Sequence, residues 1–308
     1  MNRRVLAVLI SCFLLSCDDK LGNEKPFVFF VIGDWGQRGS AEQMAVAKQM
    51  DAWAAMESPK YIISTGDNFY YDGVADTDDS HWSESFENVY NGEHLANVPW
   101  IVSLGNHDYQ GNPTSEIDYS ATSPRWRLPS RYYSFTESLD NGEGIQFAVL
   151  DTSPLVSDYY VSSPFKDELM AQDTAQQLRW LSDVTRDNTP GWKIVIGHHP
   201  MYTGGYRRNE LNSVRPRLEP VFTRNHVDVY ISGHEHDLQH LKFNDKPTHQ
   251  LISGAGAATR PTGTLPETIF SASENGFLVV TIQYRKMRVK FVNDQGEVIH
   301  ESVISSSR

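Results

Sequence analysis

The main part of this chain has no cysteine. The only two cysteines, Cys12 and Cys17, lie close to the start of a sequence of 308 residues. A disulfide framework and a thiolate metal site are therefore both excluded for everything that follows. If such a chain is exported, its stability must depend on its apolar core and on any metal that it binds.

The chain also lacks an apolar run of about 20 residues, the length expected of a membrane-spanning helix. Its longest apolar stretch is the short one from Val5 to Leu15, which follows Arg3 and Arg4. A basic start, a short apolar centre and small residues after it are typical of a secretory signal. We therefore predict a signal peptide over residues 1–16 and an exported protein, either periplasmic or at the cell surface.

The end of this signal carries a second pattern. Leu14-Leu15-Ser16-Cys17 resembles a bacterial lipobox, in which the cysteine is lipidated and becomes the mature N-terminus. On this interpretation residues 17–25 form a short polar tether, and the catalytic domain covers residues 26–308. The alternative is a signal without lipidation that contains a cysteine by chance.

Positive charge is scarce, because 27 Lys and Arg face 39 Asp and Glu, for a net charge of −12. A chain of this charge repels nucleic acid and anionic membranes at long range. We therefore expect no nucleic-acid partner, a monomer, and membrane contact only through a lipid at Cys17. A phosphate site would need strong local positive charge, and bound metal ions can supply it.

Short apolar runs alternate with amphipathic stretches along most of the chain. Helices are predicted at Ser40–Met56, with Met44, Ala47, Trp53 and Met56 on the apolar face, and at Asp173–Thr185. The alternation indicates an α/β sheet with covered faces. Strands are predicted at Phe27–Ile32, Tyr61–Ser64, Trp100–Leu104, Phe147–Leu150, Lys193–Ile196 and Asp228–Ser232, and partly antiparallel ones at Gln250–Ser253, Phe277–Gln283, Met287–Val292 and Val298–Ile304.

Five of the predicted strands end in a glycine followed by a side chain that can bind a metal. In open α/β sheets ligands lie beyond the carboxyl ends of the strands, and glycine allows a sharp turn there. The set holds oxygen and imidazole donors, which suit Fe, Zn, Mn or Mg. Its members are Asp34, Asp67, Asn106, His198 and His234, with His236 two residues further on.

Each of these motifs has an ordinary alternative when it is taken alone. A Gly-Asp after a strand is usually a turn, and Gly105-Asn106-His107-Asp108 could cap a helix. The combination favours metal binding, because independent turns would not all present ligands at the same edge of a sheet.

Together the motifs resemble the signature of the purple acid phosphatases, closest to their small tartrate-resistant branch. The matching blocks are Gly33-Asp34-Trp35-Gly36, Gly66-Asp67-Asn68-Phe69-Tyr70, Gly105-Asn106-His107-Asp108, Val195-Ile196-Gly197-His198 and Gly233-His234-Glu235-His236. The resemblance implies a four-layer α/β/β/α metallophosphoesterase sandwich with mixed sheets. Wider metallophosphoesterases carry a histidine where Gly36 stands and an aspartate where Tyr70 stands, so Tyr70 is expected to replace the missing imidazole.

The resemblance also implies a role for each residue. Asp34, Tyr70 and His236 should hold Fe(III), and Asn106, His198 and His234 a divalent Fe, Zn or Mn. Asp67 should bridge the two ions. A metal-bound hydroxide would attack phosphorus, and His107 would bind the phosphoryl oxygens or protonate the leaving group. The alternative for His107 is to orient a metal ligand, and the alternative for Tyr70 is an ordinary core tyrosine.

Two segments depart from the family. Relatives place a further His or Glu after the block that ends in His198, whereas this chain has Arg207 and Arg208, which either hold a substrate phosphate or lie in a solvated loop. The segment Ser153–Gln172 lacks the cysteine that ties down the repressive loop of mammalian relatives, so no proteolytic activation is expected. The acidic run Asp72–Glu87 is predicted to be a solvated loop.

The function expected is that of an acid phosphatase acting on small phosphate monoesters. One alternative is a phosphodiesterase that uses two divalent ions, since most of the ligand set would be the same. The other is a surface lipoprotein that binds metal or phosphate without turnover.

Overall fold

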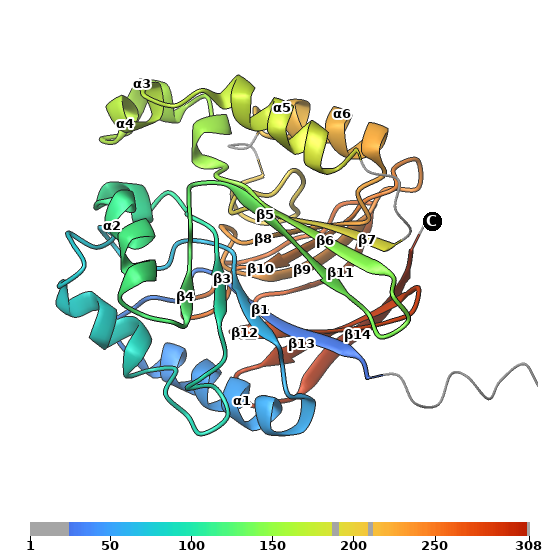
Figure 1. Ribbon diagram of the computed structural model, residues 1–308, viewed down its shortest axis with the longest axis horizontal. Helices are drawn as coiled ribbons and strands as arrows, with labels where there is room; N and C mark the ends of the chain where they lie inside the picture. Colours follow the sequence, from blue (N-terminus) through green and yellow to red (C-terminus); the bar gives the residue numbers. More distant parts are fainter. Residues whose placement is uncertain (1–24, 187–190, 209–211, 307–308) are drawn as a thin grey trace, which may run out of the picture.

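The computed structural model describes residues 25–186, 191–208 and 212–306 of the chain. Two seven-stranded sheets pack face to face, and helices cover both outer faces (Figure 1). This arrangement confirms the predicted four-layer α/β/β/α class with mixed sheets. The predicted signal peptide and almost all of the predicted tether lie outside the described residues. Within the described part of the chain, no helix has both the length and the apolar character needed to cross a membrane.

The first sheet has the strand order β14-β13-β12-β1-β2-β3-β4. Its strands are β1 (Phe27–Ile32), β2 (Tyr61–Ser64), β3 (Trp100–Val102), β4 (Trp126–Arg127), β12 (Gly276–Gln283), β13 (Lys286–Asn293) and β14 (Val298–Ser305). Strands β1 to β4 are parallel, whereas β12 joins β1 in antiparallel register, with Phe27 opposite Ile282. The antiparallel pairing of β12, β13 and β14 confirms the expected change of character towards the C-terminus.

The second sheet has the order β11-β9-β10-β8-β7-β6-β5. Its strands are β5 (Tyr133–Ser138), β6 (Gly144–Val149), β7 (Gly191–Ile196), β8 (Val229–Ser232), β9 (Leu238–Lys242), β10 (His249–Ser253) and β11 (Thr268–Ala272). Strands β6, β7, β8 and β10 are parallel. The sequence patterns did not predict β4, β5, β9 and β11, and three of these four are edge strands with partly exposed faces.

Three apolar layers hold the sandwich together. The central layer lies between the sheets and includes Phe29, Phe147 and Val289. An aromatic layer around Trp35 and Trp100 lies outside the first sheet, under α1 (Ala41–Glu57). The third lies outside the second sheet and is covered by α5 (Thr174–Val184) and α6 (Arg215–Asn225). The remaining helices are short: α2 (Pro113–Asp118), α3 (Tyr159–Ser162) and α4 (Lys166–Met170).

The predicted apolar face of α1 is only partly confirmed, since Ala47 is buried and Trp53 packs against the aromatic layer, while the helix and its Ser40 cap are confirmed. Met44 and Met56 are 45% and 67% exposed, and the buried face is formed by Gln43, Val46, Ala47, Met50 and Ala54. Gln43 can be buried because its carbonyl accepts the Gln37 and Gly39 N–H groups, while its amide donates to Ser85.

The acidic run Asp72–Glu87 is not simply a solvated loop. It ends in a short π-helix, Trp82–Glu87, whose Trp82 and Phe86 side chains are buried in the aromatic layer. In the same segment the His81 ring lies 3.2 Å from the backbone carbonyl of Gly36. The acidic side chains thus alternate with buried groups that support the loop after β1.

Three histidines outside the strand-end motifs, His240, His249 and His300, form a cluster at the margin between the sheets. From this cluster we predict that the protein is less stable in acid. The ring nitrogens of His240 and His249 lie 2.9 Å apart, and Ser302 contacts both His240 and His300. Burial, followed by the neighbouring imidazoles, lowers the pKa of His240 to about 3, and burial lowers that of His249 to about 4. Between these values and the usual pKa near 6.5, the unfolded chain binds more protons than the folded one, so stability must fall as the pH falls.

We expect the free energy of unfolding to drop by roughly 3 kcal/mol or more between pH 7 and pH 4 through this cluster. Urea unfolding at both values will measure the drop. His240→Gln should make it clearly smaller, whereas the same change at the exposed His94 should not. Equal pH dependence in the two variants would show that the cluster does not control acid stability.

Candidate metal centre

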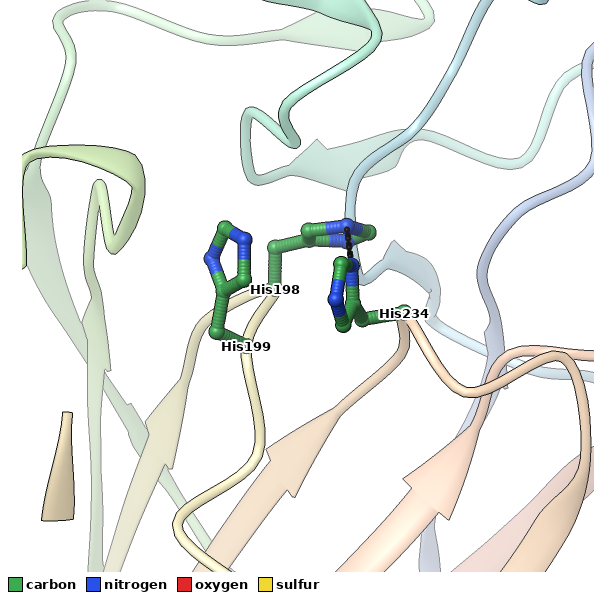
Figure 2. Close-up of side chains that lie close together, drawn as sticks. All are labelled: His198, His199 and His234. Carbon is green, nitrogen blue, oxygen red and sulfur yellow. Dashed lines mark hydrogen bonds between the residues drawn. The ribbon is translucent and has the colours of Figure 1, made fainter. Parts of the chain in front are cut away.

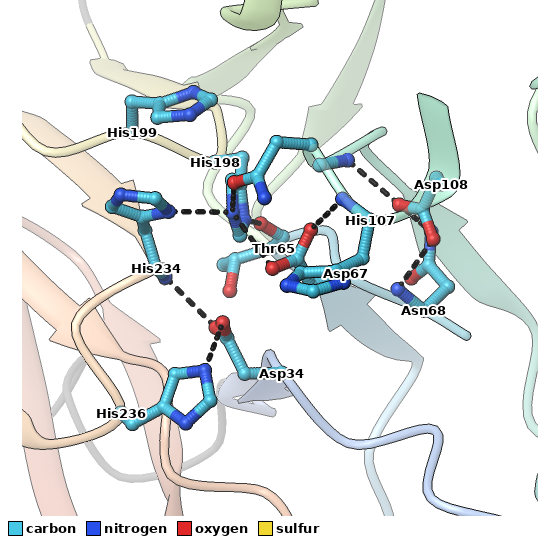
Figure 3. A network of polar contacts seen from close by, with 12 residues as sticks. Asp34, Thr65, Asp67, Asn68, His107, Asp108, His198, His199, His234 and His236 are labelled. Atoms are coloured by element: carbon cyan, nitrogen blue, oxygen red, sulfur yellow. Dashed lines mark hydrogen bonds and ion pairs between the residues drawn. The ribbon is translucent and has the colours of Figure 1, made fainter. Parts of the chain in front are cut away.

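The predicted metal ligands are brought together at one edge of the sandwich. Strands β1, β2 and β3 of the first sheet and β6, β7 and β8 of the second sheet are parallel, and their carboxyl ends face the same region (Figure 1). The side chains that follow these ends point towards one another (Figure 3).

The first group of donors surrounds the Tyr70 hydroxyl. This oxygen lies 2.8 Å from Asp34 Oδ1, 2.9 Å from Asp67 Oδ2 and 2.9 Å from His236 Nε2. His236 Nε2 is also 3.3 Å from Asp34 Oδ1. All four side chains are buried. Three oxygens and one imidazole nitrogen around one point form a donor set that fits a hard, highly charged cation.

The second group surrounds His198. Its Nε2 lies 3.2 Å from Asn106 Oδ1 and 3.1 Å from His234 Nδ1. Asp67 Oδ2, which already contacts Tyr70, is 3.3 Å from the same nitrogen. Asp67 therefore lies between the two groups, with Oδ2 near the donors of both while Oδ1 accepts the His107 N–H, a position from which its carboxylate could contact two cations.

The electrostatics of the first group favour a bound cation. Burial, and then the carboxylates of Asp34 and Asp67, raises the pKa of the Tyr70 phenol well above its usual value of 10. Two carboxylates and a phenol oxygen in contact repel one another once the phenol loses its proton, unless a cation offsets their charge. The donors of the first group thus fit a trivalent metal ion, which would favour the tyrosinate.

The second group carries less negative charge. Burial acts to lower the pKa of His198, but the Asp67 carboxylate outweighs it and raises the value to about 9. Burial and the surrounding imidazoles lower the pKa of His234 well below its usual value, so His234 is neutral and its Nδ1 can act as a ligand. His234 Nε2 is buried without a hydrogen-bond partner in the described chain. Two imidazoles and an amide oxygen fit a divalent ion, which would replace the proton that Asp67 favours on His198.

Backbone geometry sets this cluster apart from ordinary turns. Asp34, Asp67, His234 and His236 adopt positive φ angles of 57°, 51°, 71° and 46°. Residues other than glycine rarely occupy this region, and each such residue costs about 1 kcal/mol or more. The structure thus holds four of the seven predicted ligands in unfavourable conformations, which is common at functional sites.

His107 lies beside the cluster and is only partly buried. Its backbone N–H donates to Asp67 Oδ1 at 2.8 Å, and its ring packs 4.4 Å from that of Tyr70. The Nδ1 atom is 2.6 Å from the carbonyl oxygen of Tyr71. His107 therefore both orients the Asp67 carboxylate through its backbone and presents a partly exposed ring at the site.

His199 is a near neighbour that the sequence analysis did not assign. One ring nitrogen each of His198, His199 and His234 lie within 4.8 Å of one another (Figure 2), so geometry alone suggests an all-histidine site. However, His199 Nδ1 lies 2.9 Å from Thr152 Oγ1 and Nε2 lies 2.9 Å from the Tyr159 hydroxyl. With both nitrogens engaged, His199 supports the loop and leaves Asn106 as the third donor.

Whether His199 or Asn106 is the third donor can be decided from the metal content of two variants. We expect His199→Gln to keep two metal ions per chain and to lower kcat by less than about tenfold, because only an orienting contact changes. Asn106→Ala should lose about one metal ion per chain, because it removes a donor. Metal analysis of the dialysed variants measures both, and loss of metal in His199→Gln alone would make His199 a ligand.

A buried acidic network under the site was also missed. The Asn68 amide donates to Asp108 at 3.1 Å and to Glu116 at 3.0 Å, and Asp108 accepts the Asn68 and Gly105 N–H groups. Burial, and then the negative charge of Asp67, raises the pKa of Asp108 to about 7, while burial followed by Asp108 raises that of Glu116 well above its usual value. This network joins the loops that carry Asp67 and Asn106.

The loop after β7 places the two unassigned arginines differently. The Arg207 N–H donates to both carboxylate oxygens of Glu235 at 3.1 and 3.2 Å, whereas Arg208 is exposed. The Glu235 side chain is buried, and in the sequence Glu235 stands between His234 and His236. The loop after β7 is therefore hydrogen-bonded, through the Arg207 backbone, to the segment that carries His234 and His236. Of the two arginines, only Arg208 fits the prediction of a solvated side chain.

The segment 153–172, which stands in the place of the repressive loop of mammalian relatives, packs against the site. Its short helices α3 and α4 place Phe165 and Leu169 in the aromatic layer, and Tyr159 contacts His199. This packing gives the segment a structural role in orienting the loop after β7.

Comparison with known proteins places this geometry among phosphoesterases. The calcineurin-like phosphoesterase family matches residues 27–238. Purple acid phosphatase 3 of Arabidopsis thaliana is 34% identical over 284 residues, which cover 88% of this chain and 76% of the relative. Tartrate-resistant acid phosphatase type 5 of Sus scrofa is 30% identical over 292 residues, covering 89% of this chain and 85% of the relative.

Solved structures share the fold. GAP50, described as the anchor in the inner membrane complex of Plasmodium, superposes with a TM-score of 0.78 at 24% identity, covering 92% of this chain and 90% of its own. A purple acid phosphatase from seeds of Lupinus luteus has a TM-score of 0.66 at 16% identity and covers 92% of this chain, which spans 54% of the lupin protein. At these identities the likeness supports the fold alone.

Proposed function

Because the chain belongs to the calcineurin-like phosphoesterases, and within them to the purple acid phosphatases, we propose that it hydrolyses small phosphate monoesters at an Fe(III)–divalent metal centre. The divalent ion is Fe, Zn or Mn. The observation that carries the proposal is the contact of Tyr70 with Asp34, Asp67 and His236, because a phenol is a good ligand only for a strongly acidic cation.

The residues divide between the two ions as the donor groups do. Asp34, Tyr70 and His236 hold Fe(III), and Asn106, His198 and His234 hold the divalent ion. Asp67 bridges them. When bound, the two ions offset the charge of the phosphate and supply an activated water as the nucleophile.

Side chains around the metal centre have two further roles in the proposed reaction: they hold the donor atoms in place, and they transfer a proton. Tyr70 would bind Fe(III) as the tyrosinate, with its proton released to solvent, and its oxygen lies against Asp34 and Asp67. His107 uses Nδ1 to contact the Tyr71 carbonyl, which leaves its other ring nitrogen to donate a proton to the leaving oxygen. Buried donors that keep their positions lower the reorganisation cost of the step.

A direct test compares a phosphate monoester with a diester. p-Nitrophenyl phosphate should be hydrolysed with a kcat/KM at least about tenfold above that of bis-p-nitrophenyl phosphate, with an acidic optimum. A preference for the diester by an enzyme with two divalent ions would favour the phosphodiesterase alternative. Stoichiometric metal binding without turnover would favour a binding protein.

We also propose export with a lipid at Cys17, and a monomer that acts on soluble esters rather than nucleic acid. The basic and apolar pattern of residues 3–15 and the lipobox-like sequence support the first part, and the net charge of −12 supports the second. Intact mass spectrometry of the purified protein tests the lipid, and size-exclusion chromatography with light scattering tests the monomer.

A further inference from the structure

The described chain begins at the end of the sandwich that lies away from the metal centre. Phe27 starts β1 and pairs with Ile282, beside the β12–β13 hairpin, while Asp34 follows the other end of the same strand. Six residues of strand separate the two ends by about 20 Å. Figure 1 shows the chain entering β1 at the end opposite to the loops that carry the ligands.

A group of basic side chains lies on the hairpin near this point of entry, where the Lys25 N–H itself donates to Asp140. A shallow cavity of about 610 Å³ on the hairpin is lined by Arg285, Lys286 and Arg288, with Val303 and only one acidic residue, Glu143. We call these three basic residues and Val303 the hairpin surface. The Val303 side chain is 53% exposed. A basic surface around an exposed apolar residue is notable on a chain of net charge −12.

The ion pairs of the hairpin surface are weak enough to exchange. Arg285 lies 3.5 Å from Glu143, and Arg288 pairs with Glu301, and both arginine side chains are more than half exposed. Exposed pairs of this kind contribute little in water. Both guanidinium groups can therefore turn to phosphate oxygens, for which their geometry is suited.

We propose that the hairpin surface lies against anionic phospholipid headgroups and holds the metal centre facing away from the membrane. The inference rests on the proposed lipid at Cys17, but not on phosphatase activity. Seven residues lie between Cys17 and Lys25, and the fully extended chain from one to the other spans at most about 28 Å. A domain of this size is about 50 Å across, so this tether cannot reach around it to turn the opposite end towards the bilayer.

The negative net charge does not prevent this contact. Long-range repulsion is screened beyond about 8 Å at physiological salt, and a lipid anchor on a tether of at most about 28 Å keeps the hairpin surface beside the bilayer, where short-range contacts with headgroups can form. It follows that the substrate reaches the metal centre from solution and is not a phosphate carried by the same bilayer.

The lack of cysteine after Cys17 makes the orientation measurable. The full chain, purified in detergent and reconstituted into phosphatidylcholine vesicles with or without phosphatidylglycerol, would carry one new thiol for a fluorophore. Val303→Cys places the label on the hairpin surface, and Met170→Cys places it on α4 at another exposed apolar position. A quencher attached to lipid headgroups then reports which label lies near the bilayer.

We expect at least fivefold stronger quenching at 303 than at 170 in vesicles with phosphatidylglycerol. Changing Arg285, Lys286 and Arg288 to Gln should remove most of that difference. A matched control changes Lys166, Arg179 and Arg186 to Gln. It removes the same charge, and its two arginines are likewise paired with acidic residues. This control should leave the difference in quenching intact. Activity on a soluble monoester should be unchanged in both triple variants.

The outcomes separate the two proposals. Equal quenching at the two positions, or an equal effect of the two triple variants, would overturn the proposed orientation, and so would failure of the protein to remain with the vesicles. An inactive protein that shows the expected quenching would overturn the phosphatase assignment alone. Hydrolysis of phosphatidic acid included in vesicles of the same kind would contradict a metal centre that faces away.

Discussion

Asp67→Asn is expected to lower kcat/KM by at least about 10³-fold and to release metal, while the chain remains folded. Asp67 contacts the metal-donor atoms of both groups, with Oδ2 2.9 Å from the Tyr70 oxygen and 3.3 Å from His198 Nε2. An amide removes the negative charge that offsets the two cations and offers one oxygen in place of two. A 10³-fold loss corresponds to about 4 kcal/mol of transition-state stabilisation.

Asparagine is the appropriate replacement because of the backbone at this position. Asp67 has a φ of 51°, a region that asparagine tolerates better than alanine. The amide oxygen can still accept the His107 N–H at the place of Oδ1. Circular dichroism should therefore be unchanged.

The exposed Asp76→Asn serves as a control for general loss of charge. It should keep full activity and full metal content. Two metal ions per chain and near-normal activity in Asp67→Asn would show that no bridging carboxylate is needed.

Several of the candidate ligands could be predicted from the sequence because they follow a strand end closely. Asp34, His198 and His234 come within two residues of a strand end, and parallel strands of adjacent sheets bring such positions together. The buried strands were recognisable for the same reason, since they read as continuous apolar runs. The assignment of donors to each ion came from the family resemblance, not from the pattern of strands.

The residues that sequence reasoning missed act across long separations. Glu116 is 48 residues from its partner Asn68, and His199 is 47 from Thr152. No local periodicity specifies such pairs, because they form only once the loops are packed. The only local signal was the position of Asp108 within Gly105-Asn106-His107-Asp108 and of His199 next to His198.

The buried face of α1 shows a different limit of prediction from the sequence. Apolar residues occur on several sides of this helix, so the spacing of Met44 and Trp53 did not identify the buried side. The true buried face includes Gln43, whose burial depends on hydrogen bonds to loop backbone. A helix face is therefore predictable only where the partner surface is itself apolar.

Tyr70→Phe is expected to abolish the visible absorption of the metal-replete protein. In the proposed centre, colour arises from charge transfer between the Tyr70 oxygen and Fe(III), and phenylalanine removes that oxygen. The ring can be retained, since it is buried and packs 4.4 Å from His107 and 5.7 Å from His236. The two carboxylates remain in contact with the iron, so we expect activity to fall by at least about tenfold without loss of the fold.

Tyr71→Phe is the matched control, because Tyr71 is adjacent, aromatic and 71% exposed. Its absorption band and activity should be unchanged, which isolates the buried hydroxyl from general effects of removing a phenol. If the unsubstituted protein is colourless at full iron occupancy and hydrolyses diesters, Tyr70 is a core residue and the centre uses two divalent ions. If colour is lost only in Tyr70→Phe, the short contacts of its hydroxyl with Asp34, Asp67 and His236 mark the Fe(III) position, because only a donor bound to that ion can change its spectrum in this way.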